Sequence, residues 1–320
     1  MHPVIDLILN RKTEELKERI LCGKHDINGF IDSKRTALSW AAACNRTEII
    51  QMLIELGADV NQNNAGDLGY TPLEEACREG KTEAIKLLID AKADIDKGNT
   101  INSNPLIGAC IGAHTEIVKL LLANGADINH ADNSGESALH YLCRSAKSWG
   151  SATITQTING VTQELENPRF KQHTAVFELL LEHNIIVNIE NIYGYTPLHL
   201  VAETDTHEWI PSLVAKGADI NYGNLKAYTP LHCACDNGNV QTAKILIEHG
   251  ADIDAVDVHG ITPLLAATNV QNVELVRYLV ARGAEKDIPA NISYGNIGIG
   301  EDCIAVARKT GNEELIDALE

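Results

Sequence analysis

The sequence contains few aromatic residues and no long apolar run. Only 4% of its 320 residues are aromatic, including 3 Phe and 3 Trp, so a core has to be packed from Leu, Ile, Val and Ala. This composition favours small helices that stack closely. No stretch of about 18 apolar residues occurs, and the start, Met1 to Asp6, has an acid in its short apolar stretch and lacks the basic residues of a secretory signal. We therefore expect no membrane span, no export signal and a cytoplasmic location.

Basic residues are also scarce. The chain has 26 Lys and Arg against 44 Asp and Glu, a formal net charge of -18. A field of this sign repels nucleic-acid phosphates and anionic lipid headgroups. We therefore expect neither nucleic acid nor a membrane as a partner, and the acidity favours a partner protein with a basic surface.

Catalytic motifs are missing from the sequence. It has no P-loop, no Gly-x-Ser-x-Gly elbow and no Gly-x-Gly-x-x-Gly phrase between a strand and a helix. His207-Glu208 begins like a zinc-protease motif, but Pro211 occupies the place of the required second His. We expect no catalytic residue, no metal and no cofactor.

The 8 cysteines are diluted over the chain, which favours reduced thiols over a disulfide framework. Cys77, Cys110 and Cys143 recur at one constant interval. They would fall on successive helices whose axes lie about 8–10 Å apart, beyond disulfide reach, so we expect small core residues. The His and Cys residues at 232–235, with His249, form a local cluster of metal-ligand types. A metal is disfavoured there because the second spaced pair of such sites is missing.

Two short phrases recur along the chain. The first is Thr-Pro-Leu or a degenerate copy, and the second, which follows at a fixed distance, is Gly-Ala-Asp-Ile-Asn or a variant of it. Copies of the first begin at Thr36, Thr71, Asn104, Ser137, Thr196, Thr229 and Thr262, and copies of the second begin at Gly57, Lys92, Gly125, Gly217 and Gly250. Most neighbouring copies keep the interval that separates Thr229 from Thr262, which indicates an internal repeat.

Each phrase predicts one end of a helix. Thr caps a helix whose first residue is Pro, where the missing N–H costs nothing. A second helix follows, with apolar residues three and four apart, as in 117–122. The Gly of the second phrase ends this helix in a left-handed conformation. The sequence therefore predicts a unit of two helices and a loop, repeated along the chain.

These phrases, with Thr-Pro-Leu-His at 229–232 and Gly-Ala-Asp-Ile-Asn at 217–221, resemble the ankyrin-repeat family over nearly the whole chain. The resemblance implies an all-α helical repeat solenoid with β-hairpin-like loops. We expect an N-terminal capping helix pair at 1–34 and a repeat array at 35–320. The repeats start near residues 35, 70, 103, 136, 195, 228 and 261, and the C-terminal cap occupies 301–320.

An insertion interrupts the fourth repeat. The step from Ala138 to Pro197 is much longer than one repeat, which places the extra residues at 147–172, between the two helices of that repeat. Asn-Gly at 159–160 is flanked there by alternating residues, a pattern that predicts a β-hairpin. The predicted pairs are Ile158 with Val161, Gln156 with Gln163 and Ile154 with Leu165. A disordered loop is the alternative, because an isolated hairpin is marginally stable.

Three substitutions weaken the repeat pattern. Lys92 and Asn184 stand where other units have the left-handed Gly, a conformation that Asn tolerates better than Lys. Pro211 falls within the second helix of the fifth unit, where it should distort the first turn. We expect the stack to be weakest between residues 140 and 212.

The resemblance implies a non-enzymatic protein-binding module, acting as a scaffold, adaptor or inhibitor, and we expect a monomer. Loop tips and the solvent side of the first helices are free for binding in such a stack, so the concave face and the insertion are the expected contact regions. The candidate partner-binding residues are Tyr70, Arg78, Arg144, Trp149, Tyr193, Tyr195, Leu225, Tyr228, Asp236 and His259.

The tyrosines are the main reason for choosing these candidate residues. It gives a large rigid contact area at low entropy cost, and Tyr193, Tyr195 and Tyr228 lie close together in the repeat pattern. The alternative is that a Tyr before Thr-Pro-Leu only packs on the neighbouring loop. Trp149 and Phe170 flank the hairpin segment and either cover it or contact a partner.

Two other functions stay open. An enzyme would need an unrecognised active site at the insertion, near Trp149 and His173. Ankyrin-like proteins are also substrates of asparagine hydroxylases, and the matching positions are Asn61, Asn129, Asn188 and Asn221. The resemblance extends to effectors that intracellular bacteria deliver into host cells, for which the compartment would be the host cytosol.

Overall fold

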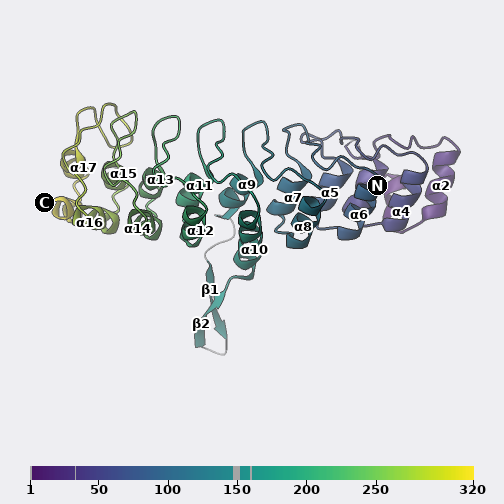
Figure 1. Cartoon of the computed structure of the whole chain (residues 1–320), viewed down its shortest axis with the longest axis horizontal. Coiled ribbons are helices and arrows are strands. Elements are labelled where there is room, and N and C mark those ends of the chain that lie inside the picture. The colour runs from purple at the N-terminus through teal and green to yellow at the C-terminus, as the bar shows by residue number, and fades with distance from the viewer. Residues whose placement is uncertain (1, 33, 147–151, 159–160) are drawn as a thin grey trace. The chain divides into compact units, whose positions relative to one another are not determined.

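The computed structural model describes residues 2–32, 34–146, 152–158 and 161–320. These residues form paired helices joined by loops, together with a two-stranded hairpin (Figure 1). The elements are α1 (Pro3–Leu9), α2 (Thr13–Leu21), α3 (Ala37–Ala43), α4 (Thr47–Glu55), α5 (Pro72–Arg78), α6 (Thr82–Asp90), α7 (Pro105–Ile111), α8 (Thr115–Ala123), α9 (Ala138–Ser145), β1 (Thr153–Ile158), β2 (Val161–Glu166), α10 (Pro168–Glu182), α11 (Pro197–Thr204), η2 (His207–Trp209), α12 (Ile210–Ala215), α13 (Pro230–Asp236), α14 (Val240–Glu248), α15 (Pro263–Asn269), α16 (Val273–Ala281), α17 (Cys303–Thr310) and α18 (Glu313–Leu319). The predicted solenoid of helical repeats is confirmed.

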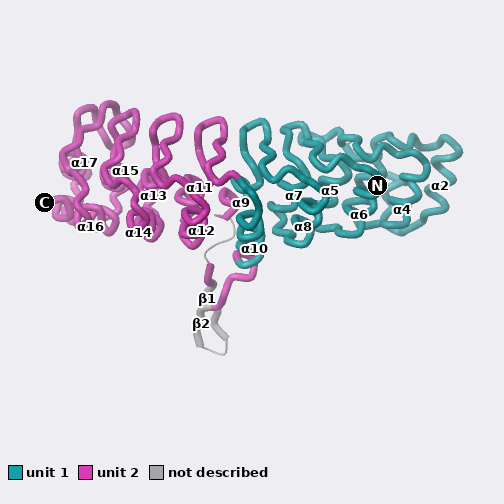
Figure 2. The backbone as a smooth tube through the Cα atoms, in the orientation of Figure 1, with its two compact units in different colours: residues 1–142, 171–185 teal, residues 143–170, 186–320 magenta. Residues whose placement is uncertain are grey.

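The chain divides into two compact units, residues 1–142 with 171–185 and residues 143–170 with 186–320 (Figure 2). In the first unit α1, α3, α5 and α7 contact one another in order, and each packs against the helix that follows it. In the second unit α11, α13, α15 and α17 do the same. Each repeat therefore buries its apolar faces against its neighbours in the chain.

Small side chains line the first helices of the repeats. Ala76, Ala109 and Ala234 are fully buried, and so are the free thiols of Cys77 and Cys110. These cysteines are small core residues, as predicted. No helix in the part of the chain that the structure describes is long and apolar enough to cross a membrane.

The predicted helix caps are present. The Thr71 hydroxyl accepts a hydrogen bond from Glu74 N at 3.1 Å, and the Asn104 side chain accepts one from Ile107 N at 3.0 Å. In each case Pro holds the first helical position. Loss of such a cap costs about 1 kcal/mol.

A buried His in the first helix links one repeat to the next. His232 Nδ1 accepts from Thr229 N at 3.1 Å, so its ring proton lies on Nε2, which donates to the Ile261 carbonyl at 2.9 Å. His199 makes the equivalent bond to the Tyr228 carbonyl at 2.9 Å. Each of these side chains thus joins its own repeat to the next one.

The left-handed backbone conformation predicted from the repeat pattern is present at Lys92 but not at Asn184. Lys92 has a φ of 66°, as predicted for the residue that replaces Gly. Asn184 has no positive φ; that prediction was wrong, because α10 ends at Glu182 and its last turn closes through a bond from His183 N to Leu180 O. Pro211 shortens α12 to 6 residues, preceded by the 3-10 turn η2, as expected.

The insertion contains the predicted hairpin. Ile158 pairs with Val161, Gln156 with Gln163 and Ile154 with Leu165, which is the predicted register. The end of the insertion is helical, because α10 begins at Pro168 and has 15 residues, whereas α8, the second helix of the preceding repeat, has 9. Phe170 is buried and its ring lies 5.9 Å from that of Trp209, so packing is the correct alternative for Phe170. Trp149 lies outside the described residues.

One first helix carries an acid in the place of the repeat His. Glu74 follows Thr71-Pro72-Leu73 and is 0% exposed. Its Oε1 accepts from Asn99 Nδ2 at 2.9 Å, whereas Oε2 is buried without a hydrogen-bond partner among the described residues. Burial raises the pKa of Glu74 to about 8. The folded chain therefore holds this carboxyl in its protonated form at neutral pH.

Glu74→Gln should stabilise the chain in a pH-dependent way. The folded carboxyl keeps its proton up to about pH 8, whereas the unfolded one ionises near its ordinary value. The contribution of Glu74 to stability is therefore fully present at low pH and is lost as the pH rises toward 8. We expect Glu74→Gln to raise the free energy of unfolding by about 1–3 kcal/mol at pH 8 and to change it little at about pH 4, measured by urea denaturation.

The exposed Glu79, which caps the end of the same helix, provides the matched control. Glu79→Gln should lack the gain in stability that Glu74→Gln produces at pH 8. A pH-independent difference between Glu74→Gln and the natural chain would contradict the assignment.

Candidate partner-binding surface

A buried Asn or Asp shapes each loop tip of the second unit. Asn191, Asn224 and Asp257 stand five residues before the capping Thr of α11, α13 and α15. Each Oδ1 accepts two backbone N–H groups from its own loop, for example from Lys226 N at 2.8 Å and Tyr228 N at 3.1 Å in the case of Asn224. These hydrogen bonds hold the loop backbone in place, and the side chains on the outside of the loop are not needed for its conformation.

The side chains at these tips form an apolar row. Ile192, Leu225 and Val258 occupy the same position in successive repeats and are 55%, 71% and 56% exposed. Successive tips are joined by backbone bonds, from Leu225 N to Tyr193 O at 3.3 Å and from Val258 N to Lys226 O at 2.9 Å. In Figure 1 the loops before α11, α13 and α15 project side by side. The row is therefore continuous.

Gly194 permits the close approach of two of these loops. It has a φ of 77°, and a Cβ there would lie 2.7 Å from Leu225 N. A side chain at this position would force the tips apart. The loop tips are thus held by both hydrogen bonds and backbone contact.

The same repeat position is polar in the first unit. Counting four residues back from each cap gives Asp32, Asp67, Thr100 and Asn133. The stack therefore accepts polar residues at this position. The apolar residues of the second unit are not required by the fold.

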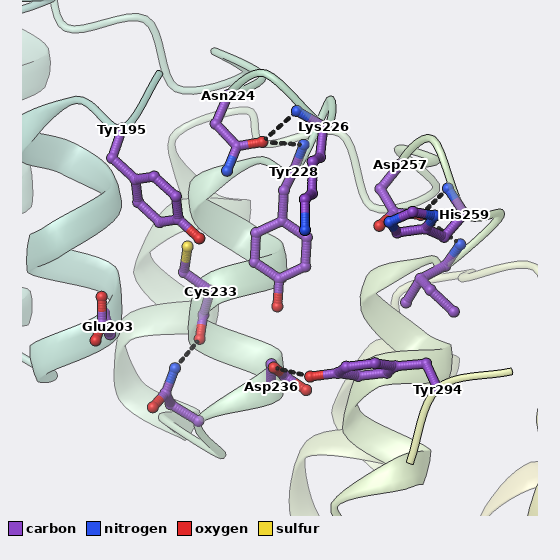
Figure 3. Close-up of a pocket in the computed structure, with 12 residues that line it drawn as sticks. Tyr195, Glu203, Asn224, Lys226, Tyr228, Cys233, Asp236, Asp257, His259 and Tyr294 are labelled. Carbon is purple, nitrogen blue, oxygen red and sulfur yellow. Dashed lines mark hydrogen bonds between the residues drawn. The ribbon is translucent and has the colours of Figure 1, made fainter. Parts of the chain in front are cut away.

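Two adjoining pockets lie beside the apolar row, on the first helices of the second unit. One, of about 440 Å³, is lined by residues that include Arg144, Tyr193 and Leu225. The other, of about 320 Å³, is lined by residues that include Tyr228 and Tyr294 (Figure 3). Both pockets share Tyr195, Glu203, Asn224 and Lys226. We call the two together the groove.

Most of the predicted contact residues meet at the groove. Those that line it are Arg144, Tyr193, Tyr195, Leu225, Tyr228, Asp236 and His259. Tyr70 and Arg78 belong to the first unit, where the Arg78 guanidinium lies 4.7 Å from the centre of the Tyr70 ring. The structure thus brings seven of the ten predicted residues together and leaves these two apart; Trp149 is the tenth.

Tyr195 and Tyr228 are less exposed than the sequence pattern implied. The Tyr195 ring lies 5.3 Å from that of His199 and the Tyr228 ring 4.9 Å from that of His232, and both tyrosines are half-buried. Each therefore packs on the first helix of its own repeat. Tyr193, by contrast, is 64% exposed.

The phenols of the groove are hydrogen-bond donors at neutral pH. Burial raises the pKa of Tyr195 and of Tyr294 to about 12, and burial also raises the pKa of Tyr228. Tyr294 donates to Asp236 Oδ2 at 2.9 Å. Burial likewise raises the pKa of the Cys233 thiol, which keeps it protonated and unlike an activated nucleophile.

Several residues of the apolar row and of the groove have no counterpart in the sequence prediction. Ile192 and Val258 of the row could have been found from the repeat register, since Leu225 was already a candidate. Glu203 sits on the open side of α11, where charge is common. Tyr294 comes from the loop before α17, where the repeat phrases are lost, and no pattern marks it.

The residues of the metal-binding and enzyme alternatives lie outside the groove or form no site within the described residues. In the described residues no group of three or more His, Cys, Asp or Glu lies close enough to hold a metal ion. His173 is buried within α10, and Trp149, the other residue of the enzyme alternative, is outside the described range.

The candidate hydroxylation sites lie in the loops that follow the second helices. The side chains of Asn61, Asn188 and Asn221 each accept a backbone N–H of the next repeat, at 2.8, 2.9 and 2.8 Å. Asn129 donates to Asn184 O at 3.3 Å. A hydroxylase would have to draw these side chains out of the stack, and their modification stays a prediction.

Thiol labelling checks the assignment of Cys233 and Cys235 as core residues. Among the cysteines, Cys22 is exposed and Cys44 half-buried, and the remaining ones are buried. We expect a disulfide reagent such as Ellman's reagent at pH 8 to modify Cys22 rapidly, Cys44 slowly and the others only after unfolding. Peptide mass spectrometry assigns the sites. Rapid reaction of Cys233 or Cys235 in the folded chain would reopen a reactive role for this pair.

Comparison with known proteins identifies the repeat. The family model for ankyrin repeats matches three times, at residues 6–99, 73–157 and 208–290. The chain is 41% identical over 69 residues to 26S proteasome non-ATPase regulatory subunit 10 of Rattus norvegicus, a match to 22% of this chain and 29% of that protein. It is also 41% identical over 59 residues to the E3 ubiquitin-protein ligase Ufd4 of Drosophila melanogaster, over 18% of this chain and 2% of the ligase. The chain thus spans less than a third of each relative.

Two solved structures are similar over most of this chain. The human ASB11 ankyrin repeat domain has a TM-score of 0.61 at 24% identity, covering 78% of this chain and 98% of that domain. The ankyrin repeat domain of Bcl-3, a member of the IkappaB protein family, has a TM-score of 0.59 at 24% identity, covering 79% and 99%. At this identity the likeness concerns the fold.

Proposed function

The chain belongs to the ankyrin-repeat family, whose repeats are protein-protein interaction modules, and we propose that it binds a partner protein through the loop tips and groove of its second unit. In this proposal the chain acts as a scaffold, adaptor or inhibitor and catalyses no reaction. Both regions are built from the same repeats, so one partner can contact them together.

The observation that carries the proposal is the change of residue type at the loop tips. One repeat position holds Ile192, Leu225 and Val258 in the second unit and polar residues in the first. Exposing apolar side chains costs solubility and gains the stack nothing, so a contiguous row of them is typical of an interface. Tyrosines beside the row supply the residue type enriched in binding hot spots.

The partner is expected to carry a basic surface. The chain has a net charge of -18, which accelerates encounter with a basic protein and makes the rate fall as salt rises. A monomeric state and a cytoplasmic location, the host cytosol for a delivered bacterial effector, belong to the same proposal.

Replacement of the apolar row tests the proposal without disturbing the stack. Asn occupies this repeat position at Asn133, so Ile192→Asn, Leu225→Asn and Val258→Asn together should leave the melting temperature nearly unchanged. We expect partner capture by the immobilised full-length chain to be lost, and the dissociation constant of a captured protein to rise about 30-fold, which corresponds to about 2 kcal/mol. Quantitative mass spectrometry and calorimetry are the measurements.

Leu21→Asn is the matched control, since Leu21 is 66% exposed but lies at the end of α2. This variant should capture the same proteins as the natural chain. If the triple variant also captures them undiminished, the loop tips are not the interface.

Participation of the hairpin is tested separately. Ala152 O accepts from Asn167 N at 2.8 Å, so two Gly residues can replace 153–166 and join these ends in a tight turn. Because the groove residues lie outside the hairpin, we expect this deletion to weaken capture less than the triple variant does, measured in the same assay. An equal or larger loss would place the main contact on the hairpin.

A further inference from the structure

The smaller pocket of the groove combines aromatic rings with carboxylates. Tyr195, Tyr228 and Tyr294 surround it, and Glu203 and Asp236 lie at its base (Figure 3). They come from three separate parts of the second unit, the repeats of α11 and α13 and the loop before α17. The arrangement is therefore a product of the stack and not of one local motif.

The carboxylates of this pocket have unused acceptor capacity. Glu203 is half-buried, and its side chain makes no hydrogen bond or ion pair within the described ranges. Asp236 accepts from the Tyr294 hydroxyl at 2.9 Å and also lies beside the Tyr228 hydroxyl, and its carboxylate makes no ion pair within the described ranges. Partly buried anions gain more from a cation than anions in bulk water do.

The tyrosines add a second feature that attracts a cation. Tyr195 and Tyr228 each rest on a His, at centroid distances of 5.3 and 4.9 Å, which fixes the orientation of both rings. The face of an aromatic ring attracts a cation, and the attraction grows when the site is partly dry. Rings and carboxylates together thus favour a positively charged group.

The shape of the groove favours a side chain on a polypeptide. The pocket holds about 320 Å³ and continues into the neighbouring pocket through four shared residues. The apolar loop tips run beside it. A bound segment could therefore place one cationic side chain in the pocket while its neighbours contact the row.

We propose that the pocket formed by Tyr195, Tyr228, Tyr294, Glu203 and Asp236 binds the cationic side chain of an Arg or Lys of the partner protein. The inference rests on the proposed function and adds the chemistry that the partner presents. Glu203 and Asp236 supply the counter-charge, and the tyrosines supply ring faces and hydroxyl groups.

Lys226 provides an internal control, because removing its positive charge should have the opposite effect on cation binding from removing the carboxylates. It lines both pockets and is exposed, and its ammonium group forms no ion pair in the described parts of the chain. A cationic side chain that lines both pockets repels an entering cation. Removal of this charge should therefore tighten cation binding, whereas removal of the carboxylates weakens it.

Small cations test the pocket directly. The full-length chain, labelled with 3-fluorotyrosine, is titrated with ethylguanidinium and with butylammonium at constant ionic strength, and with N-ethylurea as the uncharged analogue of the former. Tyr→Phe variants at 195, 228 and 294 assign the fluorine resonances. We expect both cations to shift these three resonances saturably, the urea to shift none, and the resonance of Tyr70, in the first unit, to stay unchanged.

Charge variants then test the assigned counter-ions. Glu203→Gln with Asp236→Asn should raise the dissociation constant about tenfold, and Lys226→Gln should lower it about twofold. Equal shifts with N-ethylurea, a response without saturation, or binding indifferent to Glu203 and Asp236 would overturn the proposal. Thermal unfolding shows that each variant is folded.

The two proposals fail separately. If the cations do not bind but capture still depends on the apolar row, only the cationic side chain is excluded. If the cations bind and the apolar row does not affect capture, the pocket stands and the interface proposed above does not.

Discussion

Each repeat of this chain carries polar groups that only the next repeat satisfies, and the rest of the structure depends on this constraint. His199 and His232 each donate to a loop carbonyl of the following repeat, and the buried Glu74 accepts from the side chain of Asn99 in the next loop. A buried polar group left unpaired costs about 1–3 kcal/mol, comparable to the burial of one apolar side chain. The repeats therefore stack in one register, because a slipped or missing neighbour would leave every such group at that boundary unpaired.

This constraint also decides which positions are free to vary. At the loop tips the stack needs the inward side chains, such as Asn224, and the backbone bonds between loops; it does not need the outward ones. Leu225 and Asn133 show this, since one repeat position carries an apolar residue in one unit and a polar residue in the other. The same stack that fixes the backbone of the tips thus presents their outer side chains as a row without specifying them. Binding specificity in this fold is set by residues that contribute little to its stability.

The repeats and their helix ends could be predicted because their signals are local. A capping Thr, a first-turn Pro and a left-handed Gly act within a few residues, and the Asn-Gly pattern in the sequence predicts the register of the hairpin in the same way. Asn184 marks the limit, because its place in the repeat pattern says nothing of where α10 ends. The sequence could predict only those groove residues that stand at a fixed position of the repeat. Tyr294 reaches Asp236 across 58 residues, from a loop that has lost the repeat phrases, and no local pattern contains that contact.

In the proposed complex, the charge of the chain and the apolar loop tips act at different stages of binding. Charge attracts a partner over distance, so the acidic surface affects the rate of encounter and its dependence on salt. The apolar tips act only at contact, where excluded water sets the rate of dissociation. In the proposed complex Glu203 and Asp236 contribute to both stages, since they would attract a cation from a distance and are partly shielded from water. A partner suited to this surface therefore needs a basic residue flanked by apolar ones. A partner with charge alone would dissociate quickly, and a partner with apolar residues alone would associate slowly.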